Sequence, residues 1–458
     1  MSSFEFIDYP RGIPSTLAQI ETNESHFSGI GNNQNRFDRR WKGTVFLQFT
    51  LNYFAQLDWC KLSSNQNISA EMIECVEQNL LTLDWVRVSM NPAITMDIVN
   101  SCDSMPWYWY GVSMNPNLTM DMILQHDDDD WNFSEISRHG NLRLEMVISH
   151  PDARWNWSCV SSNSAMTLDA ISRHIDAPWD WGYVSMNHNL TLAFVDQFPE
   201  KSWSWYELSR NPSMSAAVIT TNPDRPWVWS AVSTNPGISE DLLLQLADKP
   251  YDWTALSSNP SLTPEMVLRF RDRAWNWGVL GSKVPLSVVL ELPDKPWDFR
   301  DISQNPHLTA DFIGMFPSES WNWVSISSNS CVSMSLIEAF CEKNWSWFNI
   351  SSNDSITMEV VLAHIDKPWS WSGLSENPNL TLEMITSFPD KPWDFGAISK
   401  HSFTVDRKNY VRRATARLCL LTILDEDYHR CEDELDLSKA IDLVFQNEFI
   451  ISRMIQYL

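Results

Sequence analysis

The sequence predicts an all-α protein: an α-solenoid of short helix pairs, about 14 repeats of 24 residues, with caps at its N- and C-terminal ends. Three observations lead to this fold class. Paired aromatic residues recur at a fixed period, a helix start signal recurs in the second half of each period, and apolar residues follow at helical spacing. Self-similarity at a period of 20 to 50 residues is typical of solenoids, propellers and other arrays.

The period is set by the second aromatic residue of a Trp-x-Trp pattern, which we use as the anchor of each repeat. Twelve of the 14 steps between anchors are 24 residues, one is 26 and one is 22. Of the 25 tryptophans, 24 occupy one of the two aromatic positions. The anchors are Trp59, Trp85, Trp109, Phe133, Trp157, Trp181, Trp205, Trp229, Trp253, Trp277, Phe299, Trp323, Trp347, Trp371 and Phe395.

The first half of a repeat, Pro-Trp-x-Trp-x-x-Leu-Ser-x-Asn-Pro, predicts a short helix. Proline fits the first helical turn, and Trp371 and Leu374 are three residues apart, so they share a helix face. Asn377 precedes a proline, which disfavours further helix. A strand is the competing interpretation, because Trp-x-Trp alternates with period two, but no second alternation follows.

The second half predicts another short helix that begins after a Ser or Thr N-cap. An acidic residue often follows in the first turn, where it favours the positive end of the helix dipole, and apolar pairs such as Met384-Ile385 build one stripe. Neither helix is long enough to be stable alone, so stacking is required. The predicted N-caps are Thr95, Thr119, Thr167, Thr191, Thr263, Thr309, Thr357 and Thr381.

An asparagine recurs six residues after the anchor and a serine two residues before it, as in Ser375 and Asn377. A polar pair that is present in nearly every repeat cannot be a single active site. We expect a structural ladder, in which these side chains cap the turn and bind the backbone of the next repeat. The predicted ladder comprises Asn91, Asn115, Asn163, Asn187, Asn211, Asn235, Asn259, Asn305, Asn329, Asn353 and Asn377.

The regions outside the repeats divide the chain into three parts. Residues 1–54 are expected to form an N-terminal cap, with a docking segment or small β piece as alternatives; residues 55–400 form the array. Residues 401–458 are expected to form a C-terminal helical cap, with a dimerisation or docking module as the alternative. Together these parts predict an elongated, curved molecule. The repeat at Trp277 lacks the Ser and the Asn, and we expect its second helix to be two residues short.

Charge and motif content exclude several classes of function. The net charge is −25, and about −23 of it lies in the repeats, which repels nucleic acids and anionic membranes. No apolar run is long enough to span a membrane, and the eight scattered cysteines indicate reduced packing residues of an intracellular protein. No catalytic motif occurs, so we expect no enzyme activity and no cofactor.

Three further patterns each have a structural and a functional interpretation. His126, His150, His174 and His364 share one repeat position, but stacked helices lie about 8–10 Å apart, too far for neighbouring histidines to share a metal ion. We expect half-buried packing histidines and no metal site. The tryptophans are expected to join repeats rather than form an exposed ladder for sugars, bases or peptides, because so many exposed indoles favour aggregation. Likewise, Asp127 to Asp130 predict a solvated turn rather than a Ca²⁺ loop.

The repeat motif at Asp366–Ile385 resembles the tryptophan-rich tandem-repeat proteins of giant DNA viruses. The motif is Asp-Lys-Pro-Trp-x-Trp-x-x-Leu-Ser-x-Asn-Pro-x-Leu-Thr-x-Glu-Met-Ile. The resemblance covers about residues 55–400 and implies a viral origin, with a location in the virion or the host cytoplasm. It implies no activity and no functional residues.

The function expected from these patterns is a non-enzymatic scaffold for protein–protein interaction, as a viral structural or virion-associated component. The alternative is a modular binder of an extended ligand, a basic peptide or a glycan, acting on the host cell. The partners are expected to be proteins of unknown identity, with homo-oligomerisation through the termini as one option.

Overall fold

The computed structural model describes residues 38–39, 41–77, 81–126 and 130–413. The chain divides into two compact units, Met1–Trp41 with Arg407–Leu458, and Lys42–Asp406. In the first unit, the Arg407 guanidinium donates a hydrogen bond to the Asp38 carboxylate at 2.8 Å. The predicted cap residues 1–37 and 414–458 lie outside the described residues. The second unit contains all the repeats.

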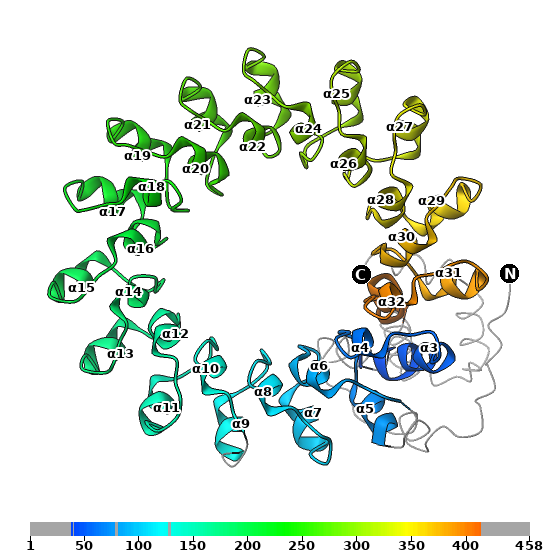
Figure 1. Cartoon of the computed structure of the whole chain (residues 1–458), viewed down its shortest axis with the longest axis horizontal. Helices are drawn as coiled ribbons and strands as arrows, with labels where there is room; N and C mark the ends of the chain where they lie inside the picture. The colour runs from blue at the N-terminus through cyan, green and yellow to red at the C-terminus, as the bar shows by residue number, and fades with distance from the viewer. Residues whose placement is uncertain (1–37, 40, 78–80, 127–129, 414–458) are drawn as a thin grey trace, which may run out of the picture. The chain divides into compact units, whose positions relative to one another are not determined.

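The described residues of this unit are helical and contain no strand, as the sequence predicts. Two rows of short helices alternate along the chain, and Figure 1 shows one row inside the other. The inner row is α4 (Trp59–Leu62), α6 (Trp85–Met90), α8 (Trp109–Val112), α10 (Phe133–Ile136), α12 (Trp157–Ser162), α14 (Trp181–Val184), α16 (Trp205–Arg210), α18 (Trp229–Val232), α20 (Trp253–Ser258), α22 (Trp277–Gly281), α24 (Phe299–Ile302), α26 (Trp323–Ser327), α28 (Trp347–Ser352), α30 (Trp371–Glu376) and α32 (Phe395–Ile398).

The outer row holds the second helix of each repeat, preceded by a π-helical turn, η1 (Lys42–Phe46), and by α3 (Leu47–Asn52). Its remaining members are α5 (Ala70–Glu77), α7 (Met96–Ser101), α9 (Met120–Gln125), α11 (Leu144–Ser149), α13 (Leu168–Arg173), α15 (Leu192–Gln197), α17 (Ala216–Thr221), α19 (Glu240–Gln245), α21 (Pro264–Arg269), α23 (Leu286–Glu291), α25 (Ala310–Met315), α27 (Met334–Ala339), α29 (Met358–Ala363) and α31 (Leu382–Ser387).

Each inner helix begins at the anchor aromatic, not at the proline three residues earlier as the sequence suggested. The residue between the two aromatics is the N-cap, and it has an extended backbone conformation, as in Ser370 with φ −85° and ψ 108°. The first aromatic therefore lies before the helix. This correction has a simple cause, because the N-cap side chain accepts a hydrogen bond from the first turn, as Ser370 does from Gly373 N–H.

The core lies between the two rows. The apolar residue three positions after each anchor is almost completely buried, as in Leu208, Leu256 and Leu374. It packs with apolar residues of the outer helices, such as Met384 and Ile385. Buried residues of the inner helices and buried residues of the outer helices recur in every repeat, so the core is continuous along the array. No repeat buries its apolar surface alone.

The array closes on itself, whereas an elongated molecule was expected. Asp58 N–H donates to Ser399 Oγ at 2.8 Å, and Asn65 Nδ2 donates to the carbonyl oxygens of Ser399 and His401 at 2.8 and 3.0 Å. These bonds have the same form as those between consecutive repeats, where Val228 N–H donates to Ser209 Oγ and Asn235 Nδ2 to the carbonyls of Ser209 and Asn211. The first and last repeats therefore pair as neighbours, and Figure 1 shows the resulting ring.

Aromatic side chains support this seam between the first and last repeats. The Phe403 ring is fully buried, with its centroid 6.2 Å from that of Phe46 and 5.5 Å from that of Phe49. Tyr53 stacks on Phe395 at 5.5 Å. Residues 42–53, which the sequence assigned to a cap, thus pack against the last repeat.

The repeat at Trp277 is shortened between its helices and not within the second one. Helix α23, Leu286–Glu291, has six residues like most other outer helices, so the expectation of a short second helix is wrong. The missing residues come from the turn after α22, where Pro285 is the N-cap position. Proline has a fixed φ suited to a helix start, which lets the turn close in fewer residues.

We expect the seam to be the place at which the ring opens. Replacing Asn65 and Ser399 together by Ala removes three hydrogen bonds between repeats that no peptide linker connects. The matched control, Asn235→Ala with Ser209→Ala, removes equivalent bonds between covalently joined repeats. Small-angle X-ray scattering should show a larger radius of gyration for the seam variant only. Equal radii for both variants, with both folded, would contradict closure by these bonds.

The acidic group Asp406 gives the seam region a pH dependence. Burial, with a smaller contribution from Glu383, raises the pKa of the Asp406 carboxyl from 3.8 to about 6, against the opposing effect of a hydrogen bond from Leu382 N–H. Because the folded-state pKa is above the unfolded value, the ionised carboxylate destabilises the folded protein above about pH 6, and this cost disappears as the pH falls towards 4.

Asp406→Asn should therefore raise the melting temperature at pH 7.5 and leave it unchanged at pH 4. The expected gain is on the order of 1–3 kcal/mol at the higher pH. Burial lowers the pKa of His401 nearby, but His401 titrates alike in both proteins, so the difference between them isolates Asp406. The exposed Asp390→Asn is the control. A gain that is the same at both pH values would mean that charge burial is not its cause.

Candidate interaction surface

All eleven predicted ladder asparagines join one repeat to the one before it, whereas bonds to the next repeat were expected; the serines make those, as Ser209 Oγ accepts the N–H of Val228. Each Nδ2 donates to a backbone carbonyl of the preceding repeat, and each Oδ1 accepts the N–H two residues further on. For Asn211 the donor bonds are 2.9 Å to Ser185 O and 3.0 Å to Asn187 O. These side chains are buried and fully used by the fold, so they are not available to a ligand.

The structure adds ladder members that the sequence pattern did not reveal. His139 Nε2 lies 2.7 Å from Ser113 O, and His401 Nε2 lies 2.8 Å from Asn377 O. Lys283 Nζ donates to Ser258 O at 3.0 Å. All three occupy the asparagine position, six residues after the anchor. The sequence contained a signal for these members, because His or Lys replaces Asn at this repeat position and each keeps a hydrogen-bond donor there.

The eight predicted threonine N-caps stand immediately before their outer helices. Six of them accept a hydrogen bond from the first turn, as Thr381 does from Met384 N–H at 3.2 Å. Thr95 and Thr357 occupy the N-cap position without a capping hydrogen bond from the side chain. A second set of caps was not predicted: in 13 of the 15 described inner helices the residue between the aromatics, Asp, Asn or Ser, caps the helix.

The tryptophans join repeats, as the sequence predicts. The first aromatic of each pair is buried or half-buried, and its ring meets the preceding anchor edge to face, as Trp227 meets Trp205 at 5.3 Å. Its Nε1 also donates to a backbone carbonyl five residues earlier, at 2.8 Å from Trp227 to Asn222 O. The anchors are half-buried, and six are covered by a Lys or Arg of the next linker, such as Lys391 over Trp371 at 5.1 Å.

The histidines and cysteines of the described residues form no metal site: no group of three or more His, Cys, Asp or Glu is placed to hold an ion. His126, His150 and His364 are half-buried as expected, whereas His174 is exposed. The expectation of packing cysteines holds for Cys75, which is buried, but Cys60 and Cys341 are exposed. Within the same residues, no helix has the length and apolar character needed to cross a membrane.

The side chains that remain for a ligand are the exposed ones, and those of the inner row differ from repeat to repeat. The residue after the anchor is never buried and includes Tyr110, Ser134, Gly182, Arg300 and Phe348. The buried residue two positions later is always Val, Ile or Leu. The inner row thus combines a constant interior with a variable exposed surface, which is the usual arrangement of a solenoid that binds partners.

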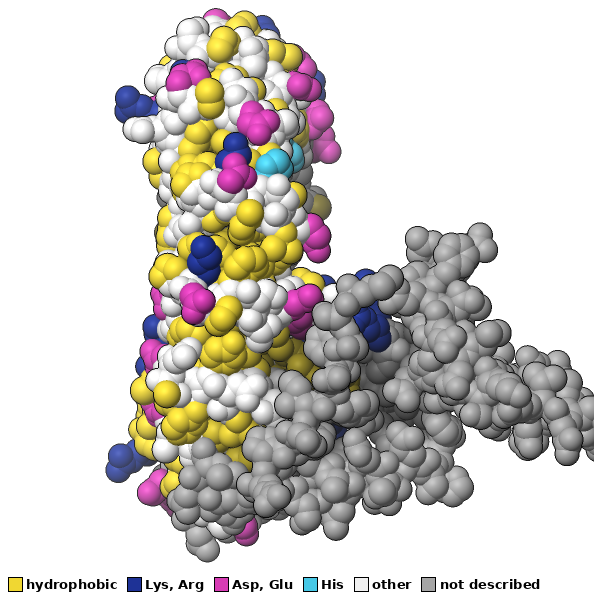
Figure 2. Space-filling view, turned by 90° about the vertical axis from the view of Figure 1, so that its right-hand side faces the viewer, with side chains coloured by type: hydrophobic (Ala, Val, Ile, Leu, Met, Phe, Trp, Pro, Cys, Tyr) yellow, Lys and Arg dark blue, Asp and Glu magenta, His cyan; other side chains and the backbone are white. Residues whose placement is uncertain are grey.

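Exposed apolar side chains gather on two neighbouring inner segments. Val86, Met90, Tyr108, Tyr110 and Met114 are all exposed, and we call them the α6–α8 patch. Five more lie in two smaller groups: Tyr183, Met186 and Tyr206 on the α14 and α16 segments, and Val324 and Phe348 on α26 and α28. The ring edge seen in Figure 2 also presents apolar groups, which lie beside uncharged polar surface and a few acidic and basic side chains.

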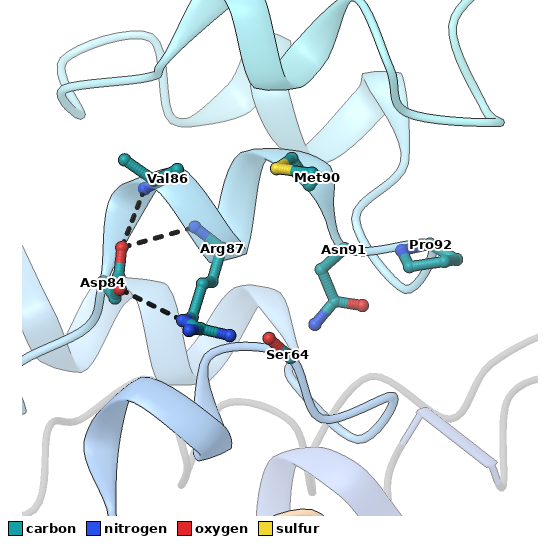
Figure 3. Close-up of a pocket in the computed structure, with 7 residues that line it drawn as sticks. All are labelled: Ser64, Asp84, Val86, Arg87, Met90, Asn91 and Pro92. Carbon is teal, nitrogen blue, oxygen red and sulfur yellow. Dashed lines mark hydrogen bonds and ion pairs between the residues drawn. The ribbon is translucent and has the colours of Figure 1, made fainter.

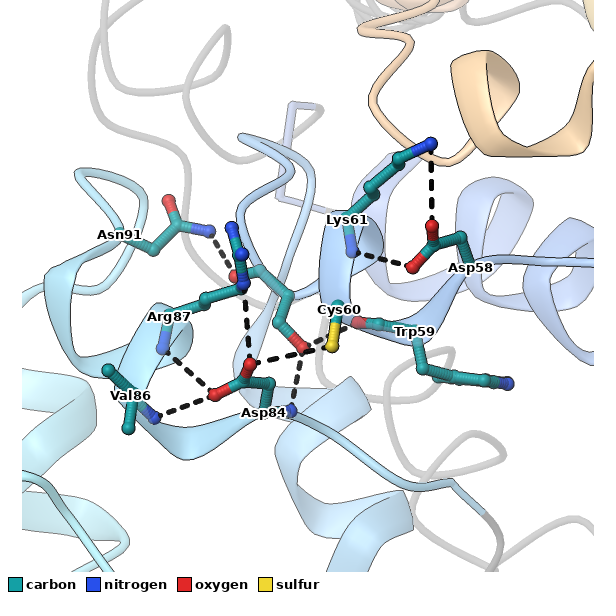
Figure 4. A network of polar contacts seen from close by, with 9 residues as sticks. Asp58, Trp59, Cys60, Lys61, Asp84, Val86, Arg87 and Asn91 are labelled. Carbon is teal, nitrogen blue, oxygen red and sulfur yellow. Dashed lines mark hydrogen bonds and ion pairs between the residues drawn. The ribbon is translucent and has the colours of Figure 1, made fainter.

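A hollow of about 540 Å³ adjoins the patch (Figure 3). Val86, Met90 and Pro92 supply its apolar lining, and Asp84, Arg87, Asn91 and Ser64 its polar lining. Arg87 is held by the Asp84 carboxylate at 3.3 Å, and Asp84 N–H is held by Ser63 Oγ at 2.8 Å (Figure 4). The polar rim is therefore fixed by the ladder.

A second hollow, of about 440 Å³, lies at the seam. Lys61 of the first repeat and Lys400 of the last line it, with Glu376 and Asp394. Lys61 is paired with Asp58 at 3.4 Å, and Asp394 caps α32. Two of its four charged groups, Lys61 and Asp394, are thus already engaged by the fold.

No known protein family, characterised protein or solved structure matches the chain. The function is therefore inferred from the exposed side chains of the described residues.

The ladder makes a specific prediction at Asn211. Asn211→Ala should cost about 1–3 kcal/mol of unfolding free energy, because the buried Ser185 carbonyl loses this donor and the Asn187 carbonyl keeps only a backbone N–H. Asn211→Asp should cost more, since a carboxylate of the same shape cannot donate and would face those carbonyls. Asn211→His should cost less than Ala, because His139 and His401 provide a donor there naturally. Urea denaturation measures all three, and a cost for Asp no larger than for Ala would contradict this role.

Proposed function

We propose that the chain is a non-enzymatic scaffold that binds other proteins through the exposed side chains of its inner helices. The observation that carries this proposal is the contrast between the two kinds of position in one repeat. Ladder, core and aromatic positions are nearly constant, while the exposed position after the anchor varies among Cys, Val, Tyr, Ser, Gly, Thr, Arg and Phe. Folding needs only the constant positions, so variation at the exposed ones provides different contacts around the ring.

The resemblance of the repeat to giant-virus tandem-repeat proteins supports a place in the virion or in the cytoplasm of an infected host. A modular binder of a basic peptide is the second candidate, and the net charge of about −23 on the repeats favours it. A glycan is a less suitable ligand, because the tryptophan faces that would stack on sugars are used between repeats.

Cross-linking mass spectrometry on the tagged full chain, purified from the cells that produce it, tests the scaffold. The expected result is a stoichiometric partner linked to lysines of the inner segments, namely Lys61, Lys283 and Lys400. Lysines of the linkers, such as Lys249 and Lys391, are the internal comparison. A chain that purifies alone, with links only to itself, would refute the scaffold. Mass spectrometry of purified virus particles then assigns the location: many copies mean a virion component, and absence means a factor of the host cytoplasm.

A further inference from the structure

We propose that the α6–α8 patch binds a cationic segment of a partner protein, with apolar side chains of that segment as its anchors. This inference rests on the proposed scaffold function and specifies the site and the kind of partner.

The five side chains form one surface. Val86 and Met90 are four residues apart on α6, so they share a helix face. Tyr110 is on α8, and Met114 is in the turn that follows this helix. The Tyr108 and Tyr110 rings are 5.7 Å apart. Gly111 lies between the two segments: a Cβ on it would be 3.1 Å from Met90 Cγ and 3.2 Å from Tyr108 Cδ1.

Folding does not require these apolar groups. Other repeats have Ser134 in the place of Tyr110, Ser162 in the place of Met114 and Asn132 in the place of Tyr108. Those repeats form the same helices and the same ladder. Exposed Tyr and Met that the fold does not need are typical of protein interfaces, where aromatic residues and Met are enriched.

The hollow beside Val86 and Met90 gives the patch depth. Its volume, about 540 Å³, is sufficient for an apolar anchor side chain. The rim is fixed by the Asp84–Arg87 pair, so the site is already formed before binding.

The charge of the repeats selects the partner. The repeats together hold a formal net charge of about −23, and the described residues 84–126 and 130–138 contain six acidic and two basic side chains, a net charge of −4. Both basic residues are paired within the chain, Arg87 with Asp84 and Arg138 with Glu135. The repeats that carry the patch therefore attract a cationic segment and repel nucleic acids and acidic peptides.

Fluorescence anisotropy with the full chain tests this inference. The probe is a short fluorescein-labelled peptide of lysine and leucine. Two comparison peptides have serine in place of every leucine, or glutamate in place of every lysine. The patch variant combines Val86→Ser, Met90→Ser, Tyr108→Asn, Tyr110→Ser and Met114→Ser. The control variant changes the other five exposed apolar residues of the inner segments: Tyr183→Ala, Met186→Ser, Tyr206→Ser, Val324→Ser and Phe348→Ser. None of these changes alters the net charge.

We expect the wild type and the control variant to bind the lysine–leucine peptide equally, and the patch variant to bind it at least about tenfold more weakly. Neither comparison peptide should bind as well. Equal binding by the patch variant would overturn the inference, as would equal binding of the lysine–serine peptide or no binding by the wild type. Far-UV circular dichroism and melting curves establish that both variants are folded.

Cross-linking with the patch variant separates this inference from the scaffold proposal. If the variant still recovers the partner found with the wild type, the patch is not the site although the scaffold function holds. If the wild type recovers no partner, the scaffold proposal itself fails.

Discussion

The hydrogen bond from an asparagine side chain to the backbone of the preceding repeat is the interaction on which the structure depends. The helices have only four to eight residues, too few to be stable separately. Each turn between helices presents carbonyl groups that the next repeat covers when it stacks, and that repeat supplies a side-chain donor to them. Asn235 satisfies them at 3.0 Å, while its own oxygen holds the N–H of Gly237 at 2.7 Å. One side chain thus shapes its own turn and fixes the next repeat on the previous one.

The tryptophans add area and orientation to this ladder. Each edge-to-face pair joins an anchor to the first aromatic of the next repeat, and the indole N–H of a tryptophan at that first position donates to a backbone carbonyl, as Trp179 does to His174 O. Aromatic pairs of this geometry contribute about 0.5–1.5 kcal/mol beyond the burial of their surface. Because every repeat uses the same contacts, the rotation between successive repeats is reproduced along the chain. Fifteen inner helices in one turn correspond to about 24° per repeat.

Much of the fold could be predicted from the sequence, because its local signals are strong. The period, the two helices, the threonine N-caps and the ladder asparagines all follow from residue types at fixed spacing. The predicted start of the inner helix was wrong. Trp369 and Trp371 are equally aromatic, and only the capping hydrogen bond to Ser370 identifies Trp371 as the first helical residue. Closure could not be predicted, since it depends on a small rotation summed over all repeats. The α6–α8 patch was not predicted either, because the sequence alone does not show which aromatic side chains are buried and which are exposed.

A closed ladder limits how such a gene can change. An open solenoid can gain or lose a unit by duplication or deletion, since each unit contacts only its neighbours. Here Asn65 must meet the carbonyls of Ser399 and His401 after one full turn. One added unit would require every step to rotate by about 22.5° instead of about 24°, or would leave the last unit unpaired. Ring closure therefore constrains the unit count as a whole, and new specificity is expected to arise by point substitution at exposed positions rather than by copying of units.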